Sequence, residues 1–224
     1  MIFDLFRNGF SMDLVINLCA RLFVLFCVLP VHEFAHAFVA TKLGDQTARL
    51  SGRLTMNPLA HLDLMGTLMI LLVGFGYAKP VPVNPRNFKH KKGGMALTAA
   101  AGPLSNLLMA LIYLFIYVLV YLKVRPDNGT IPYYLMTFCN IVAQINVSLA
   151  VFNLLPIPPL DGSRILAIVL PDKVYYKIVQ YERYIVLAVF ALLLFGVLDY
   201  PITALTRIVL KGLLYIVGLP FGIS

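Results

Sequence analysis

Long apolar stretches dominate the chain, and their lengths predict helices that cross a membrane. A spanning helix needs about 20 mostly apolar residues. The clearest stretch, residues 95–122, contains no charged residue at all. The pattern predicts five to six transmembrane helices, with further stretches at about 14–42, 131–157, 184–198 and 201–219.

The number of spans depends on residues 64–76, which are apolar over too few positions for a confident span. Residues 42–92 contain eight of the 18 Lys and Arg residues, and residues 164–183 contain four more. If 64–76 re-enters the membrane or lies in its plane, all twelve fall on one side, which the positive-inside rule makes cytoplasmic. We favour this arrangement, which has five spans and an external N-terminus. The alternative is a sixth span at 64–76, with the cluster at 79–92 on the opposite face.

Composition supports a membrane protein and excludes most soluble classes. The 224 residues are 60% hydrophobic and 12% charged, against about 45–50% and about 25% in soluble domains. Mean hydropathy is +0.87. The net charge of +8 fits basic cytoplasmic loops better than nucleic-acid binding. We expect one domain, 1–224, with its core at about 14–170 and a C-terminal helical pair at 184–219. The fold class is an all-α polytopic membrane protein with a short re-entrant or β-like segment between the first and second long helices.

The first apolar stretch carries three ionisable side chains, His32, Glu33 and His36. Ionisable groups within a membrane are costly and indicate function by default. The two histidines are four residues apart, so a helix places both on one face. The pattern H-E-x-x-H is typical of zinc metalloproteases, in which the glutamate is the general base. A buried ion pair between helices is the alternative interpretation.

A third metal ligand is expected, because catalytic zinc takes three protein ligands and keeps a fourth position for water. Asp161 is the best candidate. Three prolines within 156–159 cannot continue a helix, and we expect them to leave an extended segment before it. Irregular backbone at membrane depth must be buried in protein or line a wet cavity. The other histidines, His61 and His90, lie in loop-like or basic stretches and are expected to be solvated or interfacial. An ordinary turn aspartate is the alternative for Asp161.

With these motifs the sequence resembles the site-2 protease family of intramembrane zinc metalloproteases. The resemblance rests on HEFAH at 32–36 and NLLPIPPLDG at 153–162, with further matches at 52–61, 78–85 and 101–106. It implies that His32, His36 and Asp161 bind one Zn²⁺ and that Glu33 is catalytic. It also implies that Asn153 contacts the substrate backbone. The chain resembles the short, minimal form without a PDZ or CBS module.

Residues 77–88 contain alternating prolines, which are poor donors to a strand ladder and fit a sheet edge. An extended substrate could pair there by β-augmentation. Pro80, Val81 and Pro82 are therefore candidate substrate contacts. A plain cytoplasmic loop is an alternative that the sequence leaves open.

These features predict an intramembrane zinc metalloendopeptidase that hydrolyses peptide bonds within or beside transmembrane segments. Its role would be regulated intramembrane proteolysis or clearance of membrane peptides. The expected partners are a single-span membrane protein or membrane peptide and the lipid bilayer, and no nucleic acid. We expect an integral protein of a prokaryotic-type cell membrane, with its active site facing the cytoplasm. Two alternatives would use the same buried His, Glu and Asp site. One is a metal or proton transporter, which usually shows a second polar half, and the other is a non-catalytic membrane chaperone, which would lack the base Glu33.

Overall fold

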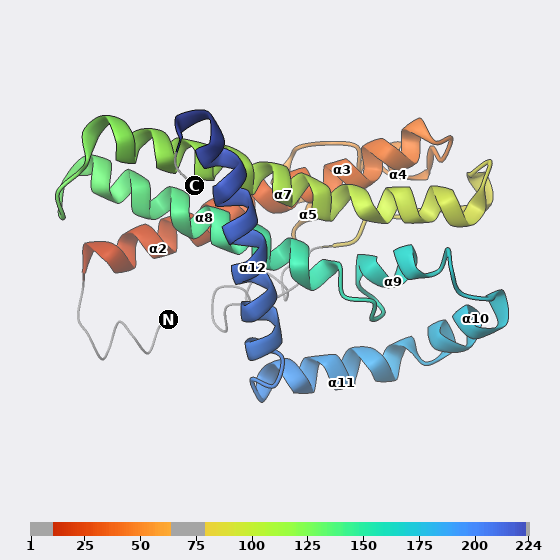
Figure 1. The fold of residues 1–224 in the computed structure, drawn as a ribbon. Helices are drawn as coiled ribbons and strands as arrows, with labels where there is room; N and C mark the ends of the chain where they lie inside the picture. The colour runs from red at the N-terminus through yellow and green to blue at the C-terminus, as the bar shows by residue number, and fades with distance from the viewer. Residues whose placement is uncertain (1–10, 64–78, 223–224) are drawn as a thin grey trace.

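The described part of the chain is mainly helical (Figure 1). The computed structural model describes residues 11–63 and 79–222, and no strand occurs within these ranges. The elements in order are α2 (Met12–Phe23), the π-helical η1 (Val24–Val28), α3 (Leu29–Lys42), α4 (Thr47–Leu50), α5 (Pro58–His61), the 3₁₀ turn η2 (Pro85–Asn87), α7 (Lys91–Val124), α8 (Ile131–Asn153), α9 (Asp161–Leu166), α10 (Asp172–Gln180), α11 (Glu182–Leu194), α12 (Asp199–Gly218) and the 3₁₀ turn η3 (Leu219–Phe221).

Four helical stretches in the described residues are long and apolar enough to cross a membrane, namely Met12–Lys42, Lys91–Val124, Ile131–Asn153 and Asp199–Phe221. The prediction of a polytopic helical membrane protein is confirmed. The stretch predicted at 184–198 forms α11, which has 13 residues and is shorter than a typical span. Residues 64–76 lie outside the described residues. The predicted total of five to six spans therefore stays a prediction.

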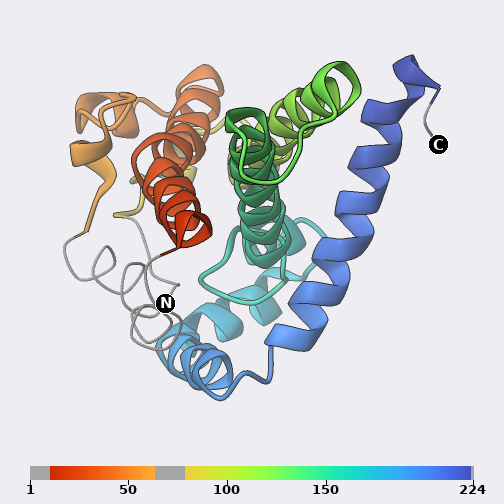
Figure 2. The same ribbon diagram turned by 90° about the vertical axis from the view of Figure 1, so that its left-hand side faces the viewer.

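The long helix α7 lies at the centre of the bundle and packs against both α3 and α8. Figure 2 shows α2 and α8 nearly end-on, with α12 running across the outer side of the bundle. Small side chains such as Ala110 and Ala143 let α7 and α8 approach closely, as in many membrane bundles. The cluster that joins α7, α8 and α12 contains Ala110, Leu114, Val118, Ala143, Val147, Val151, Leu213 and Val217.

The proline-rich segment after α8 differs from its prediction. α8 ends at Asn153, as the prolines require. However, residues 154–160 form compact turns, so the predicted extended conformation is wrong. The remaining amides bond backwards along the chain: the Ile157 N–H donates to the Leu155 carbonyl at 2.8 Å, and the Leu160 N–H donates to the Ile157 carbonyl at 2.9 Å. These turns bring α9 back against α7, with Asp161 as the first residue of α9.

Candidate metal centre

The two histidines of the H-E-x-x-H motif lie one turn apart on α3, and both are buried. Pro30, near the start of α3, has no N–H, so the carbonyl four residues earlier in the helix lacks its usual backbone donor. Just before it, the Leu29 N–H donates to the Val24 carbonyl across a wider π-type turn. Such π turns often occur at functional sites. From Leu29 the helix continues to Lys42, so His32 and His36 keep the spacing that the sequence predicts.

The facing helix, α7, reaches the histidines at a glycine. A Cβ atom at Gly102 would lie 2.3 Å from His36 Nε2 and 2.5 Å from His32 Cε1, so no larger residue fits without displacing the rings. One turn earlier on α7, the Thr98 carbonyl oxygen lies 2.7 Å from His36 Nδ1. A carbonyl can only accept, so His36 Nδ1 carries a proton, and in the neutral ring Nε2 is the atom with the lone pair. This is the tautomer that a metal ligand requires.

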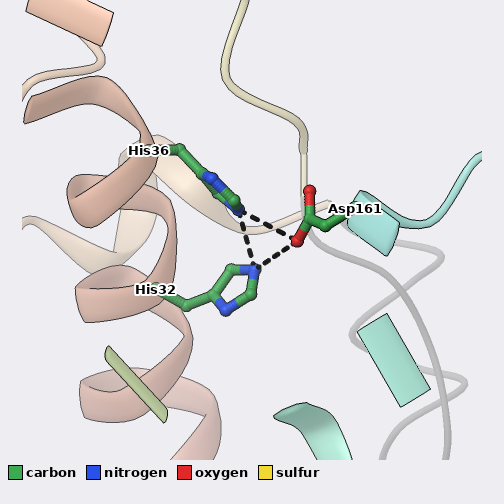
Figure 3. Close-up of side chains that lie close together, drawn as sticks. All are labelled: His32, His36 and Asp161. Atoms are coloured by element: carbon green, nitrogen blue, oxygen red, sulfur yellow. Dashed lines mark hydrogen bonds and ion pairs between the residues drawn. The ribbon is translucent and has the colours of Figure 1, made fainter. Parts of the chain in front are cut away.

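Asp161 approaches the same point from the opposite side (Figure 3). The start of α9 lies tightly against the end of α8, because a Cβ atom at Gly162 would lie 2.2 Å from the Leu154 carbonyl oxygen. Asp161 Oδ2 lies 3.2 Å from His36 Nε2 and 3.6 Å from His32 Nε2. Burial opposes ionisation of Asp161, but the two facing histidines outweigh this effect and hold its pKa below the usual range. This effect depends on protons at the histidine Nε2 atoms, and a metal ion would take the place of these protons.

The three donor atoms form a triangle of the size that zinc needs. Zinc bonds of about 2.0–2.2 Å in a tetrahedral arrangement place neighbouring ligand atoms about 3.4 Å apart. The sides of the triangle are 3.0, 3.2 and 3.6 Å, with the two Nε2 atoms closest together. Two imidazoles and one carboxylate are also a ligand set typical of catalytic zinc. The residues therefore fit a zinc ion that keeps a fourth position for water.

Glu33 follows His32 but is not part of the triangle formed by His32, His36 and Asp161. Its Oε2 atom accepts a hydrogen bond from the Val81 N–H at 3.3 Å. Glu33 therefore contacts the segment for which substrate binding is predicted. In that segment Val81 is buried, Pro80 is exposed and Pro82 is half-buried, and the described residues 79–84 form an irregular stretch. The predicted β-like character is not seen in these residues.

The loop before this segment contains His61, for which the prediction of a solvated or interfacial residue is wrong. Its side chain is only 1% exposed, because residues 55–61 fold back and the ring Nε2–H donates to the Thr55 carbonyl at 2.9 Å. The His61 carbonyl in turn accepts from the Lys79 N–H at 2.7 Å. His61 is thus a structural residue that holds the start of segment 79–84. His90 is exposed, as predicted.

Sequence reasoning missed the parts played by Thr98 and Gly102. The signal that could have found Gly102 is a glycine in the middle of a long apolar helix, where it is unfavourable unless a close approach requires it. Thr98 leaves no such signal, because its contribution is a backbone carbonyl. Asn153, predicted to contact substrate, is the half-buried last residue of α8.

Comparisons with known proteins identify the family. The model of peptidase family M50 matches residues 124–197, which include Asp161. The Bacillus subtilis protein named "Putative zinc metalloprotease YwhC" is 47% identical over 154 residues, covering 69% of this chain and 70% of that protein. The Mycolicibacterium smegmatis protein named "Putative zinc metalloprotease Rip2" is 30% identical over 139 residues, covering 60% of this chain and 51% of that protein. No solved structure matches the chain significantly. The chain belongs to peptidase family M50, the site-2 protease family, and is a membrane-embedded zinc metalloprotease.

Proposed function

We propose that this protein is an intramembrane endopeptidase that hydrolyses peptide bonds within or beside the transmembrane segments of other membrane proteins. His32, His36 and Asp161 are its zinc ligands, and Glu33 is its general base. One observation carries the proposal. Two of the three donors lie on α3 and face Gly102 of α7, and both helices belong to stretches long and apolar enough to span a membrane.

The chemistry divides between the metal and Glu33. Zinc held by the three donors supplies Lewis-acid chemistry, which makes a water molecule acidic enough to attack near neutral pH and polarises the scissile carbonyl. Glu33 takes the proton from the attacking water and delivers it to the leaving amine, a transfer that contributes about 10²–10⁴-fold. The Val81 N–H holds the carboxylate of Glu33 in one orientation for this transfer.

The substrate binds in an extended form along Pro80, Val81 and Pro82. A helical substrate hides its carbonyl groups in its own hydrogen bonds, so the peptide bond to be cut must first be unwound. This segment suits the purpose because it contacts Glu33 through Val81 and exposes Pro80. Backbone pairing of substrate along it, as in β-augmentation, would carry a scissile bond past the base. Asn153 at the end of α8 is a further contact to the substrate backbone.

The active site faces the cytoplasm of a prokaryotic-type cell. The end of α3, the start of α7, α9, α10 and the start of α11 lie at one end of the bundle (Figure 1). The described residues 42–63, 79–92 and 164–183, which form or adjoin these elements, carry twelve of the 18 basic residues. By the positive-inside rule this end is cytoplasmic. This orientation goes with the predicted arrangement of five spans and an external N-terminus, in which the stretch at 184–198 is the fourth span and the stretch at 64–76 does not cross the membrane.

Cysteine labelling tests this orientation. In a variant without Cys19, Cys27 and Cys139, single cysteines at Lys91 and Lys173 are both expected to resist an impermeant thiol reagent in intact cells. Both are expected to react after the cells are permeabilised. Labelling of one position in intact cells would contradict the proposed topology.

The roles of the two carboxylates are tested on purified protein in detergent with a single-span membrane protein that the wild type cleaves. Glu33→Gln is expected to retain zinc and lose cleavage, since the amide cannot accept the proton from water. Asp161→Asn is expected to lose both zinc and cleavage, because a neutral amide oxygen is a poorer ligand than a carboxylate. Zinc loss in Glu33→Gln together with zinc retention in Asp161→Asn would reverse the roles. Unchanged cleavage in both variants would overturn the proposed function.

A further inference from the structure

Outside the metal centre, the described residues include one more buried aspartate, Asp45. This residue follows α3 after a turn at Gly44, whose φ of +107° is a conformation that glycine adopts readily. Asp45 is 0% exposed, although aspartate is rarely buried without partners. Neither the metal site nor the proposed chemistry uses this side chain. Its burial therefore needs an explanation of its own.

The Asp45 carboxylate accepts four hydrogen bonds from two parts of the chain. On the near side, Thr47 donates through its N–H at 3.1 Å and its hydroxyl at 2.5 Å. On the far side, the Asn84 N–H donates at 2.7 Å, and Asn87 Nδ2 donates at 2.7 Å. Hydrogen bonds to an ionised acceptor are about twice as strong as neutral ones. Asp45 therefore ties the end of α3 to residues 84–87, some 40 residues further along the chain.

These hydrogen bonds hold one end of the segment that contacts Glu33. Segment 79–88 is fixed at its start by the bond between the Lys79 N–H and the His61 carbonyl. It is fixed near its other end by Asp45 at Asn84 and Asn87. Between these anchors, the Val81 N–H donates to Glu33 Oε2.

Only two residues separate Val81 from Asn84, and one of them is Pro82, whose ring restricts φ. Val81 also packs against Ala37 of α3 and Ala48 of α4. A shift at the Asp45 anchor is therefore transmitted along this short stretch to Val81.

We propose that Asp45 is a positioning residue of the protease. It places the Val81 amide against Glu33 and holds the segment Pro80–Val81–Pro82 beside the metal centre. Its effect on cleavage rests on the proposed function, whereas its effect on segment 79–88 does not. The carboxylate is required because it offers acceptor atoms only, whereas the amide of an asparagine would present an NH₂ group to some of the same donors.

The test compares Asp45→Asn with Thr47→Val in the full-length, zinc-loaded protein in detergent. Thr47→Val is the matched control, because it removes one near-side donor and the longer contact of 3.4 Å from Asn87 Nδ2 to the Thr47 hydroxyl, but leaves the bonds that Asn84 and Asn87 donate to Asp45. Hydrogen exchange followed by mass spectrometry is expected to show faster exchange in residues 79–88 of Asp45→Asn. Exchange in α7 and α8 is expected to stay unchanged. The control is expected to match the wild type in all three regions.

Activity supplies the second measurement. Cleavage is expressed as kcat/KM per bound zinc ion, so that loss of metal does not count as loss of positioning. We expect Asp45→Asn to lower this value about tenfold or more, since misplacement by about 1 Å can cost roughly 10²-fold. We expect the zinc content of Asp45→Asn to stay at the wild-type level. We expect the activity of Thr47→Val to stay within about twofold of the wild type, because the bonds from Asn84 and Asn87 to Asp45 remain.

The outcomes separate this inference from the proposed function. Unchanged exchange in residues 79–88 of Asp45→Asn overturns the inference. A fall in activity that is explained by loss of zinc, or by faster exchange throughout α7 and α8, also overturns the inference. If the wild type cleaves no membrane substrate, the proposed function fails, and the exchange measurement still decides whether Asp45 fixes the segment. If Asp45→Asn does not fold, Asn87→Ala removes one far-side bond and is judged by the same two measurements.

Discussion

The region around the metal centre and the C-terminal helices are built in opposite ways. Around the centre, α3, α7 and α9 meet through buried polar groups and through two glycines, Gly102 and Gly162, at which the neighbouring atoms leave no space for a side chain. By contrast, α11 and α12 expose large apolar side chains, with Leu187 61% and Ile208 66% exposed. In a membrane, such surfaces face lipid at little cost.

This contrast indicates how much each region depends on individual residues. Where polar groups are buried, each needs its partner, and a lost partner is costly. Where a helix faces lipid, one apolar residue replaces another with little effect. We therefore expect substitutions at the centre to change metal binding and catalysis, and substitutions in α11 and α12 to change stability slightly.

The largest effect is expected for His36→Ala. Losing one of three proposed ligands should release zinc and abolish cleavage, since even the loss of a residue that only supports a ligand costs about 10–100-fold in metal affinity or activity. Zinc per chain, measured by elemental analysis after dialysis, checks this.

His61→Ala is the matched control for His36→Ala, because His61 is a buried histidine outside the triangle. It should retain zinc but unfold at a lower temperature, because the Thr55 carbonyl loses its donor. Equal zinc content in His36→Ala and wild type would show that the triangle is not the metal site.

The next largest effect is expected for Gly102→Ala. The added methyl group would lie within 2.5 Å of both histidine rings, so the rings must shift out of the ligand triangle. We expect zinc affinity to fall by about 10–100-fold, the range seen when support for ligands is lost. Competition with a chelator of known zinc affinity measures this change.

Gly212→Ala in α12 sharpens the comparison, because nothing lies within 4 Å of the added atom. Alanine is favoured over glycine in a helix interior by about 1 kcal/mol. This variant should therefore keep wild-type zinc affinity and unfold at the same or a slightly higher temperature. A similar loss of zinc in both glycine variants would mean that the two regions do not differ as proposed.

The sequence predicted the part of the site that local rules determine. The i, i+4 spacing places His32 and His36 on one face of a helix because the helix period requires it. The prolines after Asn153 had to end α8, and this placed Asp161 near a break in the helices. Long runs of apolar residues likewise predicted the long helices, although α11 proved shorter than the run that suggested it.

What the sequence did not predict depends on contacts between distant residues. The bond between His36 and the Thr98 carbonyl joins residues 62 positions apart, and the bond between Asp45 and Asn87 joins residues 42 positions apart. Neither leaves a local pattern, since any residue offers a carbonyl and many loops contain aspartate. His61 was predicted wrongly for the same reason: its stretch has a loop-like sequence, but it forms α5 and the fold buries the ring.

A smaller effect concerns pH and the Asp45 carboxylate. Burial opposes its ionisation, but hydrogen bonds from Thr47, Asn87 and Asn84 outweigh this effect and hold its pKa below the usual value of about 4. A carboxyl group whose pKa is lower in the folded state stabilises the fold fully above its unfolded pKa, and this stabilisation is lost as pH falls through the folded pKa.

Wild type should therefore be more stable than Asp45→Asn near pH 7, and the difference should shrink below about pH 4 as the carboxylate of the wild type is protonated. Thermal unfolding of both proteins across this range measures the difference. Other carboxyl groups titrate in both proteins, so their contribution cancels in the comparison. A difference that stays constant down to acid pH would contradict the assigned hydrogen bonds.

The smallest effect is expected where the two regions meet. Ser148 of α8 and Thr206 of α12 form a hydrogen bond of 3.3 Å beside the apolar cluster shared with α7. Hydrogen bonds between membrane helices contribute about 0.6 kcal/mol on average. Ser148→Ala should therefore lower the stability of the folded state by about this amount, measured by unfolding in detergent, and leave zinc content and cleavage unchanged. Thr137→Val is the control, since the Thr137 hydroxyl donates to the Tyr133 carbonyl of its own helix. If Ser148→Ala instead lowered cleavage with zinc still bound, α12 would act on the metal centre through α8, and the separation between the two regions would have to be abandoned.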